Sequence, residues 1–549
     1  MMKRLPIFYT VAATLGIATA ASCGGPDNST SVNFDFPAID TGSYIAYIKT
    51  LSSDEFMGRM PFTKGDTLAV NYIADEFENI GLEPGNGDSY FQEVPMVGIT
   101  STPMKPLVFS NGNEQVQLEY LDDYVMASPR TDTQLDIPET ELVFAGFGIV
   151  APEYGWNDYD GLDANGKTVV VMVGDPGYYD DGLFKGDTMT YYGRWTYKFE
   201  EAARQGATGV LIIHDTGAAS YGWNVVRSGW TGSRLALESS EDMPLPAAFE
   251  GWISAGTADK LFALAGRTDL IDQAKKPGFK PVPLEITTSV SIKNDVRKSA
   301  SNNVLAKLPG STYPDEYIIY TAHWDHLGVG EPIEGDSIHN GAIDNASGIA
   351  ALFELAKAFK AVETPPERSI LFLAVTAEEQ GLLGSAYYAS HPVYPLGKTV
   401  ADINIDALSP IGRTSDIAVI GLGHSEMDDY LAKVAGQQGR SIVPGGNPSA
   451  GSFFRSDHFN FAKVGVPALY TGSGSDVVGK DSATVAQLRE TFGKRYHHVS
   501  DEYDGVWDVN GMIEDIQLAF GVGYTLSRER TFPKWKTGSE FKAAGEARF

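Results

Sequence analysis

The C-terminal half of the chain alternates between apolar segments and helical patterns. Between residues 281 and 549, segments such as EYIIYTAH, RSILFLAV and VPALYTG are rich in apolar residues, and stretches such as SGIAALFELAKAFK and MDDYLAKVAGQQG separate them. This alternation predicts strands that are joined by helices, an arrangement that forms a mostly parallel sheet between two helical layers. We therefore expect an α/β fold with a mixed, mostly parallel sheet sandwiched by helices.

Residues 105–280 have a different sequence pattern. Short β-rich runs such as ELVFAGFGIV and KTVVVMVGD dominate, and the helical stretch YKFEEAARQGA leads into the apolar run GVLIIHD. We therefore predict a β-rich domain inserted into the α/β domain. The preceding residues 37–104 are expected to be the N-terminal part of the α/β domain, with a packing helix that Asp66 can cap at its start and Gly81 at its end.

The composition is that of a folded protein with an acidic surface. Apolar residues make up 43% and charged residues 21% of the chain, which excludes a disordered chain, a coiled coil and a polytopic membrane protein. With 42 Lys and Arg against 71 Asp and Glu, the net charge is −29. Because such a surface repels phosphate backbones, nucleic acid is excluded as an expected partner.

The first residues predict export. Lys3 and Arg4 precede a mostly apolar run over residues 5–21, which is short for a bilayer span of ~20 residues and suits a secretory signal peptide. The run ends in AASCGG, which resembles a bacterial lipobox around Cys23, the single cysteine of the chain. We expect a lipoprotein signal peptide at 1–22, a lipid anchor at Cys23 and a flexible tether at 23–36, placing the protein in the periplasm or on the cell surface. The alternative is cleavage after Ala20, which leaves a free thiol.

Several predicted strands end in side chains that can bind a metal. His323 follows YIIYTA, Glu378 and Glu379 follow SILFLAVTA, Asp406 follows ADINI, and Asp344 precedes a helix in NGAIDNASG. In an open α/β sheet, ligands bind at the carboxyl ends of the strands. Burying unpaired carboxylates together would cost several kcal/mol each, and a bound cation removes that conflict.

Charge counting suggests two metal ions. Two divalent ions are neutralised by three carboxylates (Asp344, Glu379 and Asp406) together with one bridging hydroxide. Imidazole and carboxylate ligands fit zinc, with cobalt or manganese as possible substitutes. Two such ions ~3.5–4 Å apart can share a nucleophilic water and polarise a carbonyl.

These motifs resemble those of the M28 family of zinc peptidases, chiefly the bacterial aminopeptidases. The resemblance rests on His323-Trp324-Asp325-His326, GAIDNASG, the Glu378-Glu379 pair, Asp406, SDHFNFAKVGVPALY and Tyr496-His497. The segment LSSDEFMGR also fits. Within residues 105–280, VFAGFGIVAPEYGWNDYDGLDANGKTVVVMVGDPG and KFEEAARQGATGVLI resemble a protease-associated domain, a module that usually flanks a peptidase active site.

The resemblance implies a role for each site residue. Asp344 would bridge two zinc ions; His323 and Asp406 would complete one site, and Glu379 and His497 the other. Asp325 would accept the second N–H of His323, Glu378 would be the general base, and Tyr496 would donate a hydrogen bond to the developing oxyanion. A cis peptide bond is expected between Asp344 and Asn345.

The histidines leave alternatives open. His498 competes with His497 for the last ligand position; the family pattern Tyr-His-x-x-x-Asp selects His497, with Asp501 following, although His498-Val499 replaces the more usual Thr-Pro. His326 and His458 are expected to support the site or the structure without binding metal. The loop-like surroundings of the remaining candidates predict exposed side chains for His339, His391 and His424.

The favoured functional reading is a secreted or lipid-anchored di-zinc hydrolase that removes N-terminal residues from peptides. Its general base would be Glu378, its nucleophile a hydroxide shared by the two ions, and its partners peptide substrates. One alternative is a carboxypeptidase or dipeptidase of the glutamate-carboxypeptidase type, which needs a cation such as Arg455 for an α-carboxylate. Another is a non-catalytic, receptor-like binding module; such modules lose metal ligands, whereas all five candidates are present here.

Overall fold

The computed structural model describes residues 35–238 and 245–549, and the chain from Phe36 onward forms one unit. The predicted signal peptide at residues 1–22, the predicted lipidation of Cys23 and nearly all of the predicted tether lie outside the described residues. In the described part, no helix has both the length and the hydropathy that a bilayer span needs.

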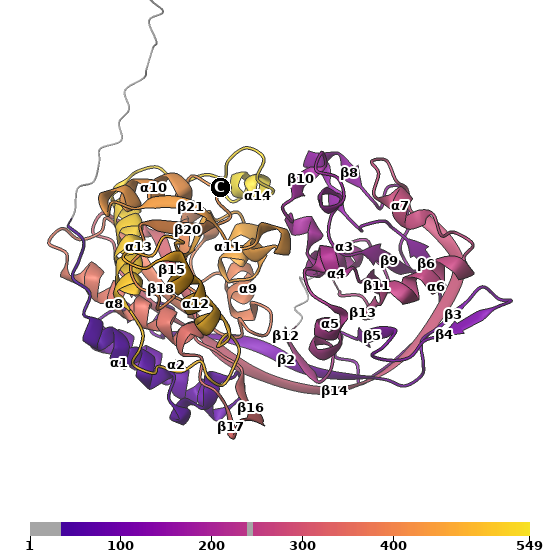
Figure 1. Ribbon diagram of the computed structural model, residues 1–549, viewed down its shortest axis with the longest axis horizontal. Helices are drawn as coiled ribbons and strands as arrows, with labels where there is room; N and C mark the ends of the chain where they lie inside the picture. Colours follow the sequence, from indigo (N-terminus) through magenta and orange to yellow (C-terminus); the bar gives the residue numbers. More distant parts are fainter. Residues whose placement is uncertain (1–34, 239–244) are drawn as a thin grey trace, which may run out of the picture. The chain divides into compact units, whose positions relative to one another are not determined.

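A mixed sheet forms the centre of the α/β part of the molecule (Figure 1). Its strands follow the order β1, β14, β18, β15, β19, β22, β20, β21. The four central strands β18, β15, β19 and β22 run parallel to one another. The bounds are β1 Glu83–Pro84, β14 Val282–Leu308, β18 Arg368–Val375, β15 Tyr313–His323, β19 Thr399–Asn404, β22 Ala468–Ser473, β20 Asp416–Ile420 and β21 Ser441–Gly445. The predicted α/β fold class is confirmed.

Helices cover both faces of this sheet because its central strands are apolar on both sides. On one face, Tyr320 and Phe372 stack on each other and pack against Phe359 of α8, which in turn contacts Phe520 of α13. On the other face, the alternate residues of the same strands pack with α9 and α11 in a separate buried cluster. The helices of the α/β part are α1 Thr41–Leu51, α2 Lys64–Ile80, α8 Ser347–Ala361, α9 Leu383–Ser390, α10 Met427–Gln437, α11 His458–Lys463, α12 Ser482–Gly493, α13 Asn510–Arg528 and α14 Lys542–Ala547.

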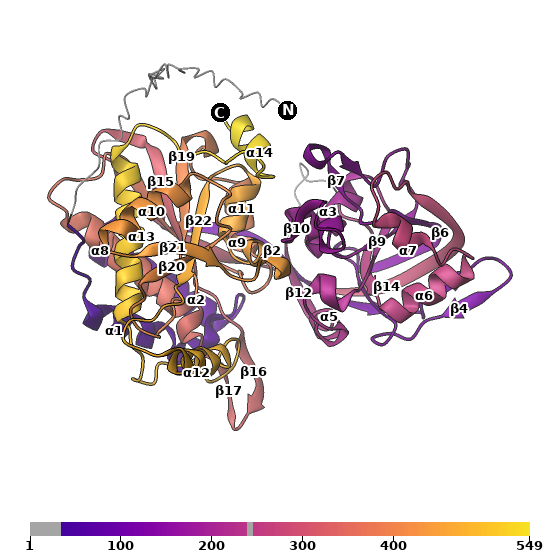
Figure 2. The same cartoon turned by 45° about the horizontal axis from the view of Figure 1, so that its top comes forward.

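The β-rich region between β2 and β14, drawn in Figure 2, has hydrophobic cores of its own. Its two buried clusters consist entirely of residues from 107 to 292. The strand order is β5, β13, β11, β9, β6 and then the first part of β14. The bounds are β2 Phe91–Pro103, β3 Val108–Ser110, β4 Gln115–Gln117, β5 Tyr124–Ala127, β6 Gln134–Phe144, β7 Val150–Ala151, β8 Trp156–Asn157, β9 Thr168–Met172, β10 Phe184–Asp187, β11 Gly209–Ile213, β12 Ser233–Leu237, β13 Phe249–Ile253, α3 Trp195–Arg204, α4 Thr216–Ala219, α5 Trp223–Gly229, α6 Ala255–Leu264 and α7 Leu270–Ala274.

The β-rich region is joined to the α/β part by a two-stranded ribbon. β2 and β14 pair antiparallel without a register shift from Phe91–Val304 to Pro103–Ile292. The predicted boundaries at 105 and 280 lie just after β2 and just before β14. The assignment of this region as a protease-associated domain stays a prediction.

A second set of contacts, here called the seam, joins the two parts away from the ribbon. The Met189 N–H donates to the Pro448 carbonyl over 3.1 Å. Ion pairs also cross the seam, between Lys185 and Glu540 at 2.7 Å and between Lys463 and Glu200 at 2.9 Å. Apolar residues from both parts, including Met189, pack together beside them.

Candidate metal centre

The parallel strands bring the predicted ligands to one edge of the sheet. His323 is the last residue of β15, Glu379 follows β18 by four positions, and Asp406 follows β19 by two. Because β18, β15 and β19 are adjacent and parallel, their carboxyl ends meet there. Asp344 reaches the same edge from the turn that precedes α8.

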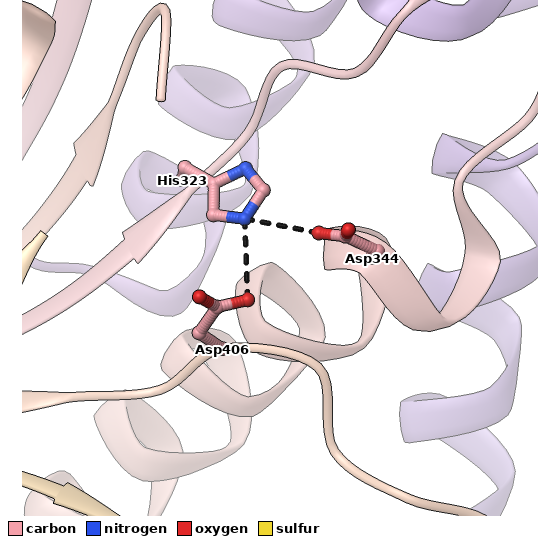
Figure 3. A group of neighbouring side chains, drawn as sticks. All are labelled: His323, Asp344 and Asp406. Atoms are coloured by element: carbon pink, nitrogen blue, oxygen red, sulfur yellow. Dashed lines mark hydrogen bonds and ion pairs between the residues drawn. The ribbon is translucent and has the colours of Figure 1, made fainter. Parts of the chain in front are cut away.

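One group of ligand atoms gathers around His323 (Figure 3). The ring Nε2 of His323 lies 3.1 Å from Oδ1 of Asp344 and 3.3 Å from Oδ1 of Asp406. These three residues offer ligand atoms that all lie within 4.8 Å of one another. The other oxygen of Asp406 accepts a hydrogen bond from the Ser456 hydroxyl at 2.6 Å, which orients the carboxylate.

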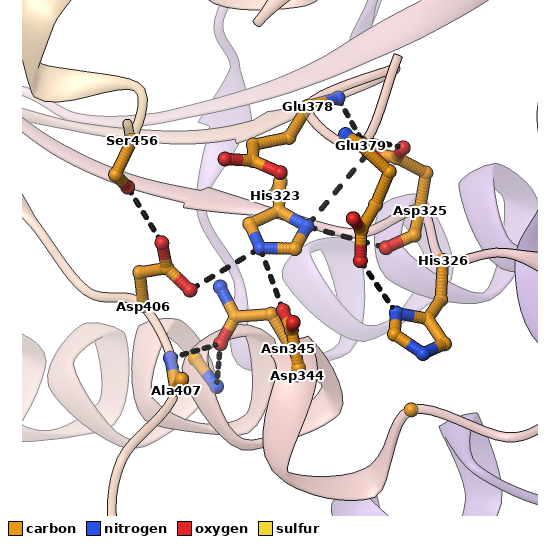
Figure 4. Close-up of polar contacts among 12 residues, drawn as sticks. His323, Asp325, His326, Asp344, Asn345, Glu378, Glu379, Asp406, Ala407 and Ser456 are labelled. Atoms are coloured by element: carbon orange, nitrogen blue, oxygen red, sulfur yellow. Dashed lines mark hydrogen bonds and ion pairs between the residues drawn. The ribbon is translucent and has the colours of Figure 1, made fainter. Parts of the chain in front are cut away.

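A second group shares Asp344. His326, Asp344 and Glu379 offer ligand atoms within 4.8 Å of one another, with His326 Nδ1 2.7 Å from Glu379 Oε1 (Figure 4). His497 Nε2 lies 2.9 Å from Glu379 Oε2 and 3.4 Å from Asp344 Oδ2. His498 instead places its Nδ1 2.9 Å from the Ser500 hydroxyl. The geometry thus favours His497 over His498, and it adds His326 as a candidate ligand.

The polar atoms of this second group suit a metal ion. Within the described residues, Glu379 Oε1, both ring nitrogens of His326 and Nε2 of His497 are buried without a hydrogen-bond partner, although these groups approach one another closely. Buried polar atoms in native proteins are almost always partnered, so such atoms require an explanation. Imidazole nitrogens and carboxylate oxygens are the donors that zinc prefers. The residues therefore fit a zinc centre.

The charges at the centre attract cations. Burial alone would raise the pKa of Asp344, but the close approach of the His323 and His497 rings holds it below its ordinary value. Burial would lower the pKa of His497, yet Asp344 and Glu379 raise it to about 10. The carboxylates thus favour positive charge strongly enough to overcome the burial of an imidazole.

Glu378 has the environment of a general base. Burial raises the pKa of Glu378 well above its ordinary value, and the carboxylates Asp406, Asp457 and Glu379 add to this effect, whereas His323 opposes it. A carboxyl group with a raised pKa can accept and return a proton near neutral pH.

Asp325 makes different contacts from those predicted. The His323 ring Nδ1 lies 3.2 Å from the Asp325 main-chain carbonyl and 3.8 Å from its carboxylate. The carboxylate accepts hydrogen bonds from the main-chain N–H groups of Glu378 and Glu379, at 3.0 and 3.3 Å. The predicted bond from His323 to the Asp325 carboxylate is therefore replaced by a bond to the carbonyl, because the strand-end turn at 378–379 occupies the carboxylate.

Asn345 connects two of the ligand loops. The Asp344–Asn345 peptide bond is cis, which confirms the expectation from the resemblance. The side-chain oxygen of Asn345 accepts hydrogen bonds from the N–H groups of Gly348 and Ala407, at 2.9 and 3.1 Å. Since Ala407 follows Asp406, this contact ties the turn that carries Asp344 to the end of β19.

Two tyrosines lie near the carboxylates. Tyr496 stacks on His497 with ring centroids 3.8 Å apart and is 63% exposed. Tyr470, the third residue of β22, was not singled out from the sequence. Burial raises the pKa of the Tyr470 hydroxyl, and the nearby carboxylates Asp406 and Asp344 raise it further. Either hydroxyl is therefore a candidate donor to an oxyanion. The available sequence signal for Tyr470 was its position in the apolar run VPALY.

Comparisons with known proteins agree with this geometry. The model of peptidase family M28 matches residues 303–521, a range that includes every candidate ligand. This part of the chain is therefore similar to the peptidases of family M28.

Among curated proteins, aminopeptidase NAALADL1 of Mus musculus is 36% identical over 138 residues, which are 24% of this chain and 17% of that protein. Aminopeptidase YwaD of Bacillus subtilis (strain 168) is 27% identical over 199 residues, or 35% of this chain and 40% of that protein. The chain thus aligns with less than half of the length of either relative.

Among solved structures, the aminopeptidase from Aneurinibacillus sp. strain AM-1 is similar in fold. The comparison covers 90% of this chain and 95% of that one, with a TM-score of 0.50 and 20% sequence identity.

Proposed function

We propose that this protein is a two-zinc aminopeptidase that hydrolyses N-terminal residues from peptides. The observation that carries the proposal is the pair of ligand groups that share Asp344, each with one further carboxylate and an imidazole. The match to family M28 and the aminopeptidases to which the chain is similar support the same reaction class.

Each of the two ligand groups would hold one ion. His323, Asp344 and Asp406 would hold one zinc ion, and Asp344 and Glu379 would hold the other with His497 or His326. Bound zinc supplies the chemistry of a Lewis acid, lowering the pKa of water and polarising a carbonyl.

The remaining steps belong to protein groups. Glu378 takes the proton from the attacking water and delivers it to the leaving amine, a role that its raised pKa suits. A hydroxyl of Tyr496 or Tyr470 donates a hydrogen bond to the oxygen on which negative charge develops. Asp325 holds the Glu378–Glu379 turn through its two main-chain hydrogen bonds, so that the base and the ligand keep their separation.

A free N-terminus suits the charge of this site. The carboxylates Asp344, Glu378, Glu379 and Asp406 outnumber the cationic groups beside them, and they raise the pKa of the neighbouring histidine. With two zinc ions bound to the other three, Glu378 would be the carboxylate left to favour the ammonium group of a substrate N-terminus over a blocked, neutral one.

The test compares blocked and unblocked substrates. We expect purified protein to cleave aminoacyl anilides, to leave their N-acetylated forms intact, and to lose turnover with a chelator and regain it with zinc. Equal rates on the blocked and free substrates would contradict the assignment as an aminopeptidase.

One observation favours a second candidate, a carboxypeptidase or dipeptidase. Arg455, which directly precedes Ser456, donates to the Ala450 carbonyl, and the Arg194 Cδ lies 3.4 Å from where a Cβ of Gly451 would be. Neither arginine forms an ion pair within the described residues, and Nε of Arg194 is buried without a hydrogen-bond partner there. Burial and the nearby Arg455 lower the pKa of Arg194 to about 10.

Two guanidinium groups at the seam favour an anion such as a peptide α-carboxylate. If this candidate is right, dipeptides with a free C-terminus are cleaved at least tenfold faster than their amides, and Arg194→Gln removes the difference. Equal cleavage of acids and amides by the unmodified protein would exclude it.

We also propose that the protein is exported and anchored by a lipid on Cys23. The support is the sequence of residues 1–23 alone. Expressed in a bacterium, the protein should incorporate a labelled fatty acid and sediment with membranes, whereas the Cys23→Ala variant should not be labelled.

A further inference from the structure

A buried guanidinium group contacts two of the turns that carry candidate metal ligands. Arg59, in the predicted LSSDEFMGR motif, is 1% exposed. Its Nε donates to the Trp324 carbonyl at 2.8 Å, its Nη1 to the carbonyls of Leu51 and Asn340 at 2.5 and 2.6 Å, and its Nη2 to the Gly341 carbonyl at 2.9 Å. Four carbonyls from three segments of the chain thus converge on one side chain.

Two of these segments carry candidate ligands. Trp324 lies between His323 and Asp325, in the turn that follows β15. Gly341 begins the turn that leads to Asp344. Arg59 therefore connects the loop of the terminal imidazole ligand to the loop of the shared carboxylate.

The acceptors of Arg59 are unusual for their surroundings. Asp501, Asp325, Asp344 and Glu379 all lie close enough to act on its charge, yet within the described residues Arg59 hydrogen-bonds only to carbonyls and forms no ion pair. Burial lowers the pKa of Arg59 to about 10, which leaves the group charged at neutral pH. A direct ion pair would occupy the oxygens that a metal needs, whereas carbonyl contacts leave them free.

We propose that Arg59 is a positioning residue for the metal centre. Its hydrogen bonds fix the separation of the His323 and Asp344 loops, and its charge offsets the repulsion among the carboxylates without competing for their oxygens. This inference rests on the proposed zinc site, because it concerns the affinity of that site for its ions.

A role confined to holding the N-terminal segment in place is a separate possibility. That segment has other anchors, since the Asn340 amide donates to the Ser52 carbonyl and to the Asp54 carboxylate, both at 2.9 Å. A segment anchor affects overall stability, whereas a positioning residue changes zinc affinity beyond any change in stability.

The experiment measures zinc affinity by competition with a chromophoric chelator, alongside the thermal stability of the metal-free protein. We expect Arg59→Lys, which keeps the charge but not the planar donors, to weaken zinc binding roughly 10–100-fold, as loss of groups that orient ligands typically does. The matched control is Arg368→Lys. Arg368 is equally buried but donates to the Leu526 carbonyl and to Glu316, away from the ligands, so this variant should lose stability and keep zinc affinity.

A second variant allows chemical rescue. Arg59 has a φ of 50°, in the left-handed region that favours glycine, so Arg59→Gly does not strain the backbone there. Methylguanidinium added to Arg59→Gly should restore zinc affinity by at least threefold and have no effect on Arg368→Gly.

Unchanged zinc affinity in Arg59→Lys, or the same loss in Arg368→Lys, would overturn the inference. If the unmodified protein itself binds no zinc, the proposed metal centre fails, and that result is distinguishable because it precedes any comparison of variants.

Discussion

The α/β part and the β-rich region both bury ionisable side chains, but they satisfy them differently. In the β-rich region, Asp158 accepts hydrogen bonds from the N–H groups of Phe147 and Ile149 and from the Trp156 indole. Lys198 in the same region donates to two carbonyls, at 2.8 and 2.6 Å. These buried charges hold loops together and need nothing else.

At the metal centre the corresponding bonds are missing. Within the described residues, Glu379 Oε1 and the ring nitrogens of His326 have no hydrogen-bond partner, although Glu379 and His326 lie 2.7 Å apart. Burial is similar in the two regions, so burial alone does not mark a functional site. The distinguishing property is that unpartnered imidazole and carboxylate atoms of several residues face one another, an arrangement that a metal ion can complete.

The largest expected effect is on zinc binding and turnover, and it distinguishes a metal ligand from the general base. Asp344→Ala should abolish both zinc binding and turnover, because Asp344 belongs to both ligand groups. Glu378→Gln should keep near-normal zinc and lose turnover by about 10²–10⁴-fold, as expected for removal of a general base. Metal analysis and kinetics on the two purified variants test these expectations. An unchanged kcat in Glu378→Gln would show that another group transfers the proton.

The next effect concerns the partnered charges of the β-rich region. Lys198→Met leaves two buried carbonyls without a donor and removes the positive charge near Asp158, so we expect a loss of about 3–5 kcal/mol in the free energy of unfolding. Zinc content per folded molecule should not change. Denaturant unfolding and metal analysis test both statements; a loss of zinc from folded Lys198→Met would break the contrast between the regions.

A smaller effect should appear in the pH dependence of stability. His458 is buried between the rings of Phe453 and Tyr470, and burial lowers its pKa from 6.5 to about 3. Below pH 6.5 the unfolded chain binds a proton that the folded protein does not, so this histidine removes about 1.4 kcal/mol per pH unit as the pH falls from 6.5 toward 3. Above pH 6.5 its contribution is constant.

His458→Gln should therefore flatten the stability profile of the metal-free protein between pH 6.5 and 4 and leave zinc affinity unchanged. The exposed His391 supplies the control variant, His391→Gln. The ring nitrogens of His458 also lack partners within the described residues. A loss of zinc from His458→Gln would mean that packing between aromatic rings does not distinguish a structural histidine from a metal ligand.

The smallest effect is expected at the seam. Lys463 and Glu200 form an ion pair with side chains that are 32% and 34% exposed. Because solvent screens such pairs, Lys463→Gln should change the free energy of unfolding by about 0.5 kcal/mol or less. Unfolding curves should show a stability difference between Lys463→Gln and the unmodified protein only at low salt. A change above 2 kcal/mol in the free energy of unfolding would mean that this pair behaves like the buried charges.

The sequence predicted the strands and the residues at their ends because both follow from local pattern. His323, Glu379 and Asp406 each come after an apolar run, and parallel pairing then brings them together. For Asp344 and His497, the resemblance to the M28 motifs in their order along the chain predicted that they belong to the same site.

What escaped prediction depends on packing between distant segments. His326 reaches Glu379 only because the turns after β15 and β18 face each other. Arg59 and Tyr470 were not singled out because their neighbours come from other parts of the chain. His424 was predicted to be exposed, but its side chain is only 15% exposed, stacked on Phe453 at the seam.

The ribbon of β2 and β14 determines how the molecule can be divided. β14 runs for 27 residues, from the pairing with β6 in the β-rich region to the pairing with β18 in the central sheet. Along β14 there is no loop between these two pairings, so a cut within it opens a continuous hydrogen-bonded ladder and leaves unpaired strand edges, which tend to aggregate. Engineers who wish to shorten this chain must therefore close the ribbon with a new hairpin turn between β2 and β14, preserving the Val304–Phe91 end of the pairing.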